Sequence, residues 1–152
     1  MKEIKDLLSE QKFFSALSSD MLEFIAGCGH NEHFKPGEFL GKEGEPADTL
    51  FMIRKGKVSV QLTHPSRGTL TILTLSAGEI AGFSWIIPPY RLLFDLKAAE
   101  HTSVIALDGT CLRKKCDDDT RLGYLLMQQS ASIMLKRLQE TRMQLLDVYS
   151  TV

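Results

Sequence analysis

The stretch TLFMIRKGKVSVQLTHPSRGTLTILTL, from Thr49 to Leu75, determines the fold class that this chain is expected to adopt. It contains three runs rich in β-branched and apolar residues, which is the composition of strands. Gly56 separates the first two runs, and this pattern predicts a hairpin there. The polar turn at residues 64–68 separates the second run from the third. The stretch therefore predicts antiparallel β-structure.

The same two-residue period extends on both sides of this stretch, over residues 30–108. Residues 34–40 are typical of strand, turn and strand, with Pro36 and Gly37 in the turn. Residues 92–99 and 102–107 are predicted to form a last pair of strands. Many short strands with turn residues between them predict a small antiparallel barrel or roll.

Helical patterns flank the β-region. Residues 3–27 predict short helices, with Ser18, Ser19 and Asp20 as a cap for the second one. Residues 109–152 contain no proline, and the segment 117–120 predicts the start of a long helix, since carboxylates favour that end of a helix. We find no linker or repeat and expect one domain over 1–152, with N-terminal helices at 1–29, a β-roll at 30–108 and C-terminal helices at 109–152.

The predicted long helix carries apolar residues at alternating spacings of three and four, which is a heptad pattern. These positions are Tyr124, Met127, Ala131, Met134, Leu138, Thr141, Leu145 and Val148. One interpretation is a single helix that packs against the roll. However, Leu122, Leu126 and Ile133 form a second stripe that could serve that purpose. We therefore predict a homodimer that associates through the heptad stripe.

Composition excludes several classes of protein. The chain has 152 residues and a net charge of −1, so it has no general attraction for nucleic acid or anionic lipid. The short basic clusters at 113–115 and 136–142 are expected to be solvated surface, and we predict no direct DNA binding. No apolar run approaches the roughly 20 residues that span a bilayer, and the N-terminus lacks the pattern of a signal peptide. Three cysteines form no even framework, so we expect no disulfide scaffold and a cytoplasmic location.

The segment LSAGEIAGFSW, residues 75–85, contains the residues best suited to binding a ligand. Small residues allow a ligand close to the backbone, and free N–H groups at a turn can hold an anion. Glu79 could accept hydrogen bonds from sugar hydroxyls, and the planar guanidinium of Arg91 suits a phosphate. Taken alone, this segment is better explained as a common Gly-Glu turn followed by a surface arginine.

Several glycine-containing motifs together resemble the cyclic nucleotide-binding domains of the catabolite-activator and fumarate-nitrate-regulator superfamily. The matching residues are Phe34, Gly37, Glu38, Leu40, Gly44-Glu45-Pro46-Ala47-Asp48, Phe51, Ile53, Gly56, Val58, Val60, Leu75, Gly78-Glu79-Ile80-Ala81-Gly82 and Arg137-Leu138-Gln139-Glu140-Thr141. The resemblance covers residues 10–149. It implies a mainly β protein with flanking helices: a jelly-roll-like double-stranded β-roll, N-terminal helices and a long C-terminal helix that forms the dimer.

The resemblance also implies a ligand site. In the family a Glu bonds the ribose, an Arg pairs with the cyclic phosphate, and a short helix presents its amides. Carried over, these roles fall on Glu79 and Arg91, and a helix hydroxyl that touches the base falls on Thr141. The full set of expected ligand-binding residues is Gly78, Glu79, Ile80, Ala81, Ser84, Arg91, Leu92 and Thr141.

Two departures from the family pattern leave the ligand open. Leu92 stands where a small phosphate-binding residue is usual, and the segment between Glu79 and Arg91 is longer. The resemblance therefore implies a regulatory domain for cAMP, cGMP or a related anion, with its protein target unknown. One alternative is a dimerisation or docking module without ligand, its pocket filled by Phe83, Trp85 and Leu92. Another is the sensor part of a transcription regulator, whose DNA-binding domain would begin near Val152.

We expect no catalysis and no required cofactor. The chain has no Gly-x-Ser-x-Gly, no Gly-x-x-x-x-Gly-Lys and no His-Glu-x-x-His motif. Cys28, His30 and His33 lie at the start of a predicted strand, where residues three apart point to opposite faces. These residues therefore predict no metal site.

Overall fold

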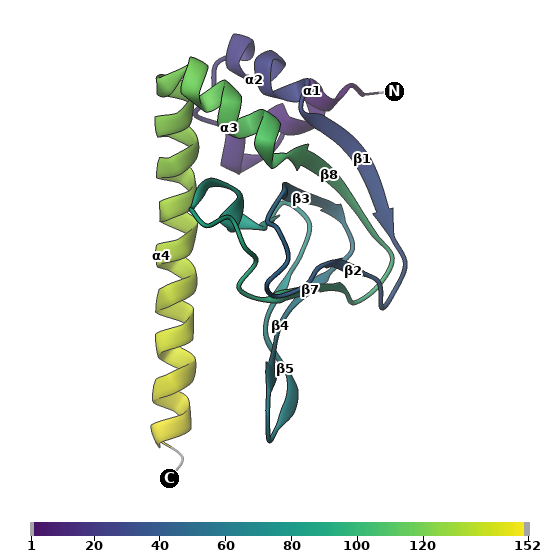
Figure 1. The fold of residues 1–152 in the computed structure, drawn as a ribbon, viewed down its shortest axis with the longest axis vertical. Coiled ribbons are helices and arrows are strands. Elements are labelled where there is room, and N and C mark those ends of the chain that lie inside the picture. Colours follow the sequence, from purple (N-terminus) through teal and green to yellow (C-terminus); the bar gives the residue numbers. More distant parts are fainter. Residues whose placement is uncertain (1, 151–152) are drawn as a thin grey trace.

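The computed structural model describes residues 2–150 and has two antiparallel sheets, with helices gathered at one end and along one side (Figure 1). The strands are β1 (Gly29–Phe34), β2 (Phe39–Gly41), β3 (Thr49–Lys55), β4 (Val58–His64), β5 (Gly68–Leu75), β6 (Ile80–Ala81), β7 (Asp95–Ala98) and β8 (Thr102–Asp108). The helices are α1 (Ile4–Ser9), α2 (Ser19–Ala26), α3 (Gly109–Asp118) and α4 (Thr120–Ser150), with 3₁₀ turns η1 (Lys12–Phe14) and η2 (Phe83–Ile86). The predicted order of short helices, strands and long helix is confirmed.

Two hydrophobic clusters share the strand β3. One sheet has the order β1-β8-β3-β6 and the other has β2-β7-β4-β5. Phe51 and Ile53 pack in a cluster with side chains from both sheets. Leu50 and Met52 belong to a second cluster, which includes the helices. Because successive side chains of a strand point to opposite faces, β3 is buried on both sides. This double-sheet roll with flanking helices confirms the predicted fold class.

The hairpin predicted at Gly56 is wrong. Strand β3 pairs with β6 and β8, whereas β4 pairs with β5 and β7 in the other sheet. Gly56 has a φ of 99°, and a Cβ atom there would lie 2.4 Å from the carbonyl oxygen of His101. The chain therefore crosses from one sheet to the other at this glycine. The local sequence has the composition of a hairpin turn, but the strands on either side of it do not pair with each other.

The predicted last pair of strands is wrong for the same reason. Strand β7 pairs with β2 and β4, and β8 pairs with β1 and β3. Strand β7 also begins at Asp95 and not at Leu92. The N–H of Leu92 instead donates to the carbonyl of Glu45 over 2.9 Å. A neighbouring segment, and not a sheet partner, therefore satisfies this part of the backbone.

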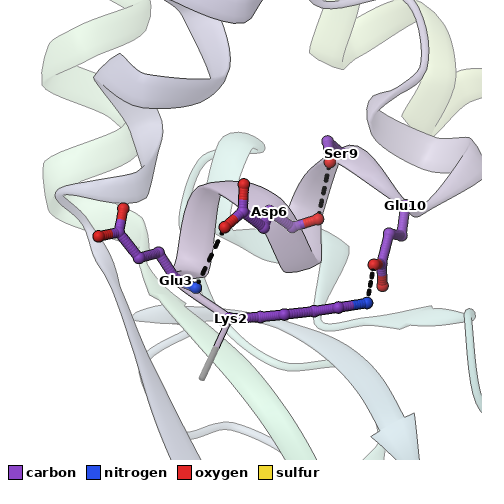
Figure 2. A network of polar contacts seen from close by, with 5 residues as sticks. All are labelled: Lys2, Glu3, Asp6, Ser9 and Glu10. Atoms are coloured by element: carbon purple, nitrogen blue, oxygen red, sulfur yellow. Dashed lines mark hydrogen bonds and ion pairs between the residues drawn. The ribbon is translucent and has the colours of Figure 1, made fainter.

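The N-terminal helices are closed by local polar contacts. The Oγ of Ser18 accepts a hydrogen bond from the N–H of Met21, which confirms Ser18 as the cap of α2. In α1 the N–H of Glu3 donates to the carboxylate of Asp6, as Figure 2 shows. The same view shows the Oγ of Ser9 donating to the Asp6 carbonyl, and an ion pair between Lys2 and Glu10. The contacts of Ser18, Asp6 and Ser9 pair backbone groups at the ends of these helices, whereas the Lys2–Glu10 ion pair joins two side chains.

The C-terminal region is two helices. Asp108 caps α3 by accepting from the N–H of Cys111, and Asp119 accepts from the N–H of Leu122 at the start of α4. Asp117 and Asp118 end α3, so of the predicted cap residues only Asp119 caps the long helix. Within residues 2–150, none of the helices combines the length and the apolar character needed to cross a membrane.

The two predicted stripes of α4 face different environments. Leu122 and Leu126 are buried in the cluster that includes the N-terminal helices, and Ile133 packs against it. On the heptad stripe, Tyr124, Met127, Leu138, Leu145 and Val148 are between 40% and 63% exposed. From residue 138 to 150 every position is exposed. The second stripe therefore attaches α4 to the body of the protein and leaves most of the heptad stripe at the surface.

A disulfide joins Cys28 to Cys111, so the expectation of no disulfide is wrong. Cys28 ends the turn between α2 and β1, and Cys111 lies in the first turn of α3. Their Cα atoms are 5.7 Å apart although 83 positions separate them in the sequence. Cys116 is a free thiol whose pKa is raised to about 11 by burial and by the nearby charges of Asp117 and Asp119. The odd and low cysteine count therefore did not indicate this pairing.

Candidate ligand-binding site

A cavity of about 330 Å³ lies between the roll, the turn η2 and the helix α4. The roll contributes side chains of β4, β5, β6 and β7, η2 contributes Phe83 and Ser84, and α4 contributes a face between Met134 and Gln144. Figure 1 shows η2 on a loop that reaches toward α4. The volume falls within the range of small-molecule pockets, about 300–1,000 Å³. A bound molecule would therefore touch the roll and the long helix together.

Contacts at Gly82, Trp85 and Tyr90 hold the loop that carries η2. Gly82 precedes the turn with a φ of 88°, and a Cβ atom there would lie 2.7 Å from the carbonyl oxygen of Thr49. Trp85 is fully buried in the cluster that includes the helices. Arg113 of α3 donates to the carbonyl oxygen of Trp85 and stacks 4.2 Å above the ring of Tyr90. These contacts direct Phe83 and Ser84 toward the cavity and Trp85 away from it.

Four of the predicted ligand-binding residues line the cavity: Ala81, Ser84, Leu92 and Thr141. Ala81 and Leu92 are buried in the cluster inside the roll. The Oγ1 of Thr141 donates to the carbonyl of Arg137 one turn earlier on α4. Four side chains from three separate segments therefore meet at one place.

The predicted acid–base pair does not line the cavity. The Glu79 carboxylate is exposed and accepts a 2.6 Å hydrogen bond from the N–H of Ser76, within the turn before β6. Arg91 is exposed, and its backbone forms an isolated bridge with Pro46. Gly78 lies in the same turn as Glu79, and Ile80 is buried in the cluster that includes the helices. The two side chains assigned to ribose and phosphate thus lie outside the walls of this cavity.

Arg137 lines the cavity, although it is not among the ligand-binding residues expected from the sequence. Its Nη2 donates to the carbonyl oxygen of Ile80 over 2.6 Å, and its guanidinium lies 5.1 Å from the centre of the Phe83 ring. Burial lowers the pKa of Arg137, and the charges of Glu79 and Glu140 partly reverse that effect. A signal for it existed, since Arg137 precedes Thr141 by four residues and so shares its helix face.

The cavity is open and is not filled as one alternative expected. Phe83 and Leu92 form part of its wall, whereas Trp85 belongs to the cluster that includes the helices.

The histidines of β1 lie away from the cavity. His33 contacts the Oγ of Ser103 over 2.9 Å, and His30 lies 3.5 Å from Glu32. No group of three metal-ligating side chains occurs in the described part of the chain.

Comparisons with known proteins agree with this architecture. The family model for the cyclic nucleotide-binding domain matches residues 31–119. A cGMP-dependent protein kinase of Toxoplasma gondii is 26% identical over 140 residues, which are 92% of this chain and 13% of the kinase. The chain thus corresponds to a small part of that relative.

Solved structures extend the likeness to three dimensions. A Geobacter metallireducens protein described as cyclic nucleotide-binding aligns with a TM-score of 0.81 and 28% identity, over 91% of this chain and 99% of the other. The catabolite activator protein of Thermus thermophilus aligns with a TM-score of 0.71 and 21% identity, over 91% of this chain and 62% of that one. At this identity, the similarity to the activator protein shows a shared fold only.

Proposed function

The chain belongs to the cyclic nucleotide-binding domain family, and on that premise we propose that it binds a small anionic ligand in the cavity beside α4 and reports binding through that helix. The observation that carries the proposal is the composition of the cavity wall. Met134, Arg137, Leu138 and Thr141 of α4 face the same space as β-roll residues. A ligand that contacts both parts favours one position of α4 relative to the roll.

The names of the chain's relatives supply the first ligands to test. The kinase relative is cGMP-dependent, and one structural neighbour, the regulatory domain of Toxoplasma gondii PKA, was solved with cAMP. The expected ligand-binding set (Gly78, Glu79, Ile80, Ala81, Ser84, Arg91, Leu92, Thr141) remains a prediction. Four of these residues already lie on the cavity wall. The proposal gives the chain a regulatory and not a catalytic role.

We also propose that the chain forms a homodimer through the exposed stripe of α4. Leu138 is 57% exposed and Leu145 is 54% exposed, and the stripe continues over several turns. Met134, Leu138 and Thr141 belong both to this stripe and to the cavity wall. A ligand that moves α4 would therefore change the geometry of a dimer built on it.

Thermal denaturation with a panel of small anions tests the proposal. The panel contains cAMP, cGMP, indole-3-acetate and octanoate, each at up to 1 mM. A ligand present at 100 times its dissociation constant stabilises the fold by about 2.7 kcal/mol, which raises the melting temperature by roughly 5–10 °C in a chain of this size.

The control variant is Ala81→Phe, which places a ring where a buried methyl group lines the cavity. We expect this variant to lose the ligand-induced shift while it keeps the circular dichroism spectrum of the parent protein. If no compound in the panel raises the melting temperature of the parent protein, the chain is a dimerisation or docking module without ligand and the sensing proposal is wrong.

A further inference from the structure

The chemistry of the cavity wall is mostly apolar. Its apolar side chains come from the roll, the η2 loop and α4: Val60, Ile72, Leu73, Leu75, Ala81, Phe83, Ile87, Leu92, Leu93, Phe94, Leu96, Met134 and Leu138. Ile87, Leu93 and Phe94 remain between 37% and 65% exposed at this site. Large apolar side chains that line a pocket and stay exposed favour a ligand that covers them with apolar surface.

Only two charged side chains among the described residues line the cavity, and they differ in exposure. Glu140 is exposed on α4, where solvent screens its charge. Arg137 is partly buried, so its charge is less screened. The guanidinium of Arg137 is therefore the one partly buried charge among the described lining residues, and the negative charges near it, those of Glu79 and Glu140, belong to exposed side chains.

The guanidinium is oriented but lacks a paired anion. Its bond to the Ile80 carbonyl and its position over Phe83 fix the planar group against the cavity wall. Among residues 2–150 no carboxylate lies within ion-pair distance of it. A guanidinium has five N–H donors, and the one hydrogen bond to Ile80 leaves donors for a ligand. A partly buried cation without a paired anion is a strong attractor for one.

The remaining polar groups are too few for a sugar. Ser84, Thr141 and Gln144 are the uncharged polar side chains that the described residues place on the wall, and the Thr141 hydroxyl already donates to a backbone carbonyl. Glu79 and Arg91, which a cyclic nucleotide of the family type would use, lie outside the wall. A buried ribose without partners would lose its hydrogen bonds to water. The cavity is thus better suited to an apolar molecule with one charged end.

We propose that the ligand of this cavity is a small amphipathic monocarboxylate, whose apolar body fills the space beside β5 and β7 and whose carboxylate pairs with Arg137. This inference rests on the proposed sensing function and specifies its ligand class. A carboxylate matches the planar fork of a guanidinium with two parallel hydrogen bonds. Because Arg137 belongs to α4, the anion would bind directly to the helix that transmits the signal.

Calorimetry with paired probes tests this inference on the full chain. The probes are indole-3-acetate and octanoate, their neutral counterparts indole-3-acetamide and octan-1-ol, and cAMP. We expect each carboxylate to bind at least tenfold more tightly than its neutral counterpart and more tightly than cAMP. We expect Arg137→Gln to weaken carboxylate binding at least tenfold. Arg142→Gln is the matched control, an exposed arginine of the same helix that does not line the cavity, and it should change the affinity less than twofold.

The outcomes separate this inference from the sensing proposal. If cAMP binds, depends on Glu79 and Arg91 and ignores Arg137→Gln, the ligand class proposed here is wrong while the sensing function stands. Equal affinity for acid and amide in the parent protein overturns the inference without any variant, so it remains testable if Arg137→Gln fails to fold. Binding of a carboxylate that persists in Ala81→Phe overturns it as well, because the molecule would then lie elsewhere.

Discussion

Gly56 is the residue at which the chain leaves one sheet and enters the other. Its φ of 99° is rare for residues with a side chain, and the carbonyl oxygen of His101 occupies the position next to its missing Cβ. Both constraints act at a point where β3 ends and β4 begins. The crossing between the sheets therefore depends on the absence of a side chain there.

We predict that Gly56→Ala destabilises the protein by about 3 kcal/mol or more, since backbone strain adds to a clash with fixed backbone atoms. Gly44→Ala is the control, because Gly44 has a similar φ of 85° but a Cβ atom there would meet no atom within 4 Å. That variant should lose only about 1–2 kcal/mol. Urea denaturation measures both, and equal losses would show that the close contact with His101 does not matter.

The hydrogen bond that Glu79 makes in its own turn changes how this residue is interpreted. Glu79 follows a glycine, and the family resemblance implies a ligand role for it, yet its carboxylate caps its own turn through Ser76. Lys35 and Glu38, and Lys42 and Glu45, form the same backbone-to-carboxylate contact at 2.7 Å. Gly37-Glu38, Gly44-Glu45 and Gly78-Glu79 thus form similar turns. Local turn chemistry therefore explains Glu79 without a ligand.

The helix α4 combines two functions on neighbouring faces. Its buried face attaches it to the cluster that includes the N-terminal helices, while Leu138 and Leu145 continue an exposed apolar stripe. Single exposed apolar residues are ordinary, but a stripe with heptad spacing is typical of helix pairing. This arrangement supports the proposed homodimer, in which α4 would be the principal contact.

We predict that Leu145→Lys weakens dimerisation at least about 100-fold. Each dimer contains two copies of this side chain, and burial of one leucine contributes about 1.5–3 kcal/mol. Met143→Lys is the control, because Met143 is 61% exposed and a step of two residues turns about 200° around the helix. Sedimentation velocity measures the association. A parent protein that is monomeric at high concentration, or two variants with equal effects, would contradict the proposed seam.

Two hydrophobic clusters and one covalent link hold the whole protein together. The strand β3 contributes side chains to both clusters, so it packs against the interior of the roll on one face and against the helices on the other. The disulfide between Cys28 and Cys111 connects the turn after α2 to the first turn of α3, which packs beside α2. The link closes a long segment that contains the whole β-roll.

We predict that the disulfide stabilises the protein by about 2–4 kcal/mol, because it restricts the unfolded chain. A reductant should lower the melting temperature of the parent protein, and Cys111→Ser should lower it equally and remove the response to reductant. Cys116→Ser is the control and should leave the response intact. With three cysteines and one disulfide, thiol titration in denaturant should find one thiol without reductant and three with it. Three thiols in the untreated protein would show that the link is absent.

Local patterns in the chain predicted most of the helices and strands and an antiparallel β-roll with flanking helices, but they missed the short strand β6 and began β7 too early. Helix and strand follow from the spacing of apolar residues along a few turns, and turns follow from glycine, proline and cap residues such as Ser18 and Asp119. These are interactions between neighbours in the chain, so the pattern contains the information that they need.

Strand pairing, the meeting of the cysteines and the lining of the cavity became visible only in the folded molecule. Residues around Gly56 have the composition of a hairpin in either sheet arrangement, and Cys28 meets Cys111 across 83 positions. Arg137 lines the cavity because α4, held against α3 and the N-terminal helices, runs beside the roll, whereas the segment of Arg91 bridges to Pro46 and its side chain lies outside the wall. Such contacts depend on how distant segments pack together, and no local pattern encodes that packing.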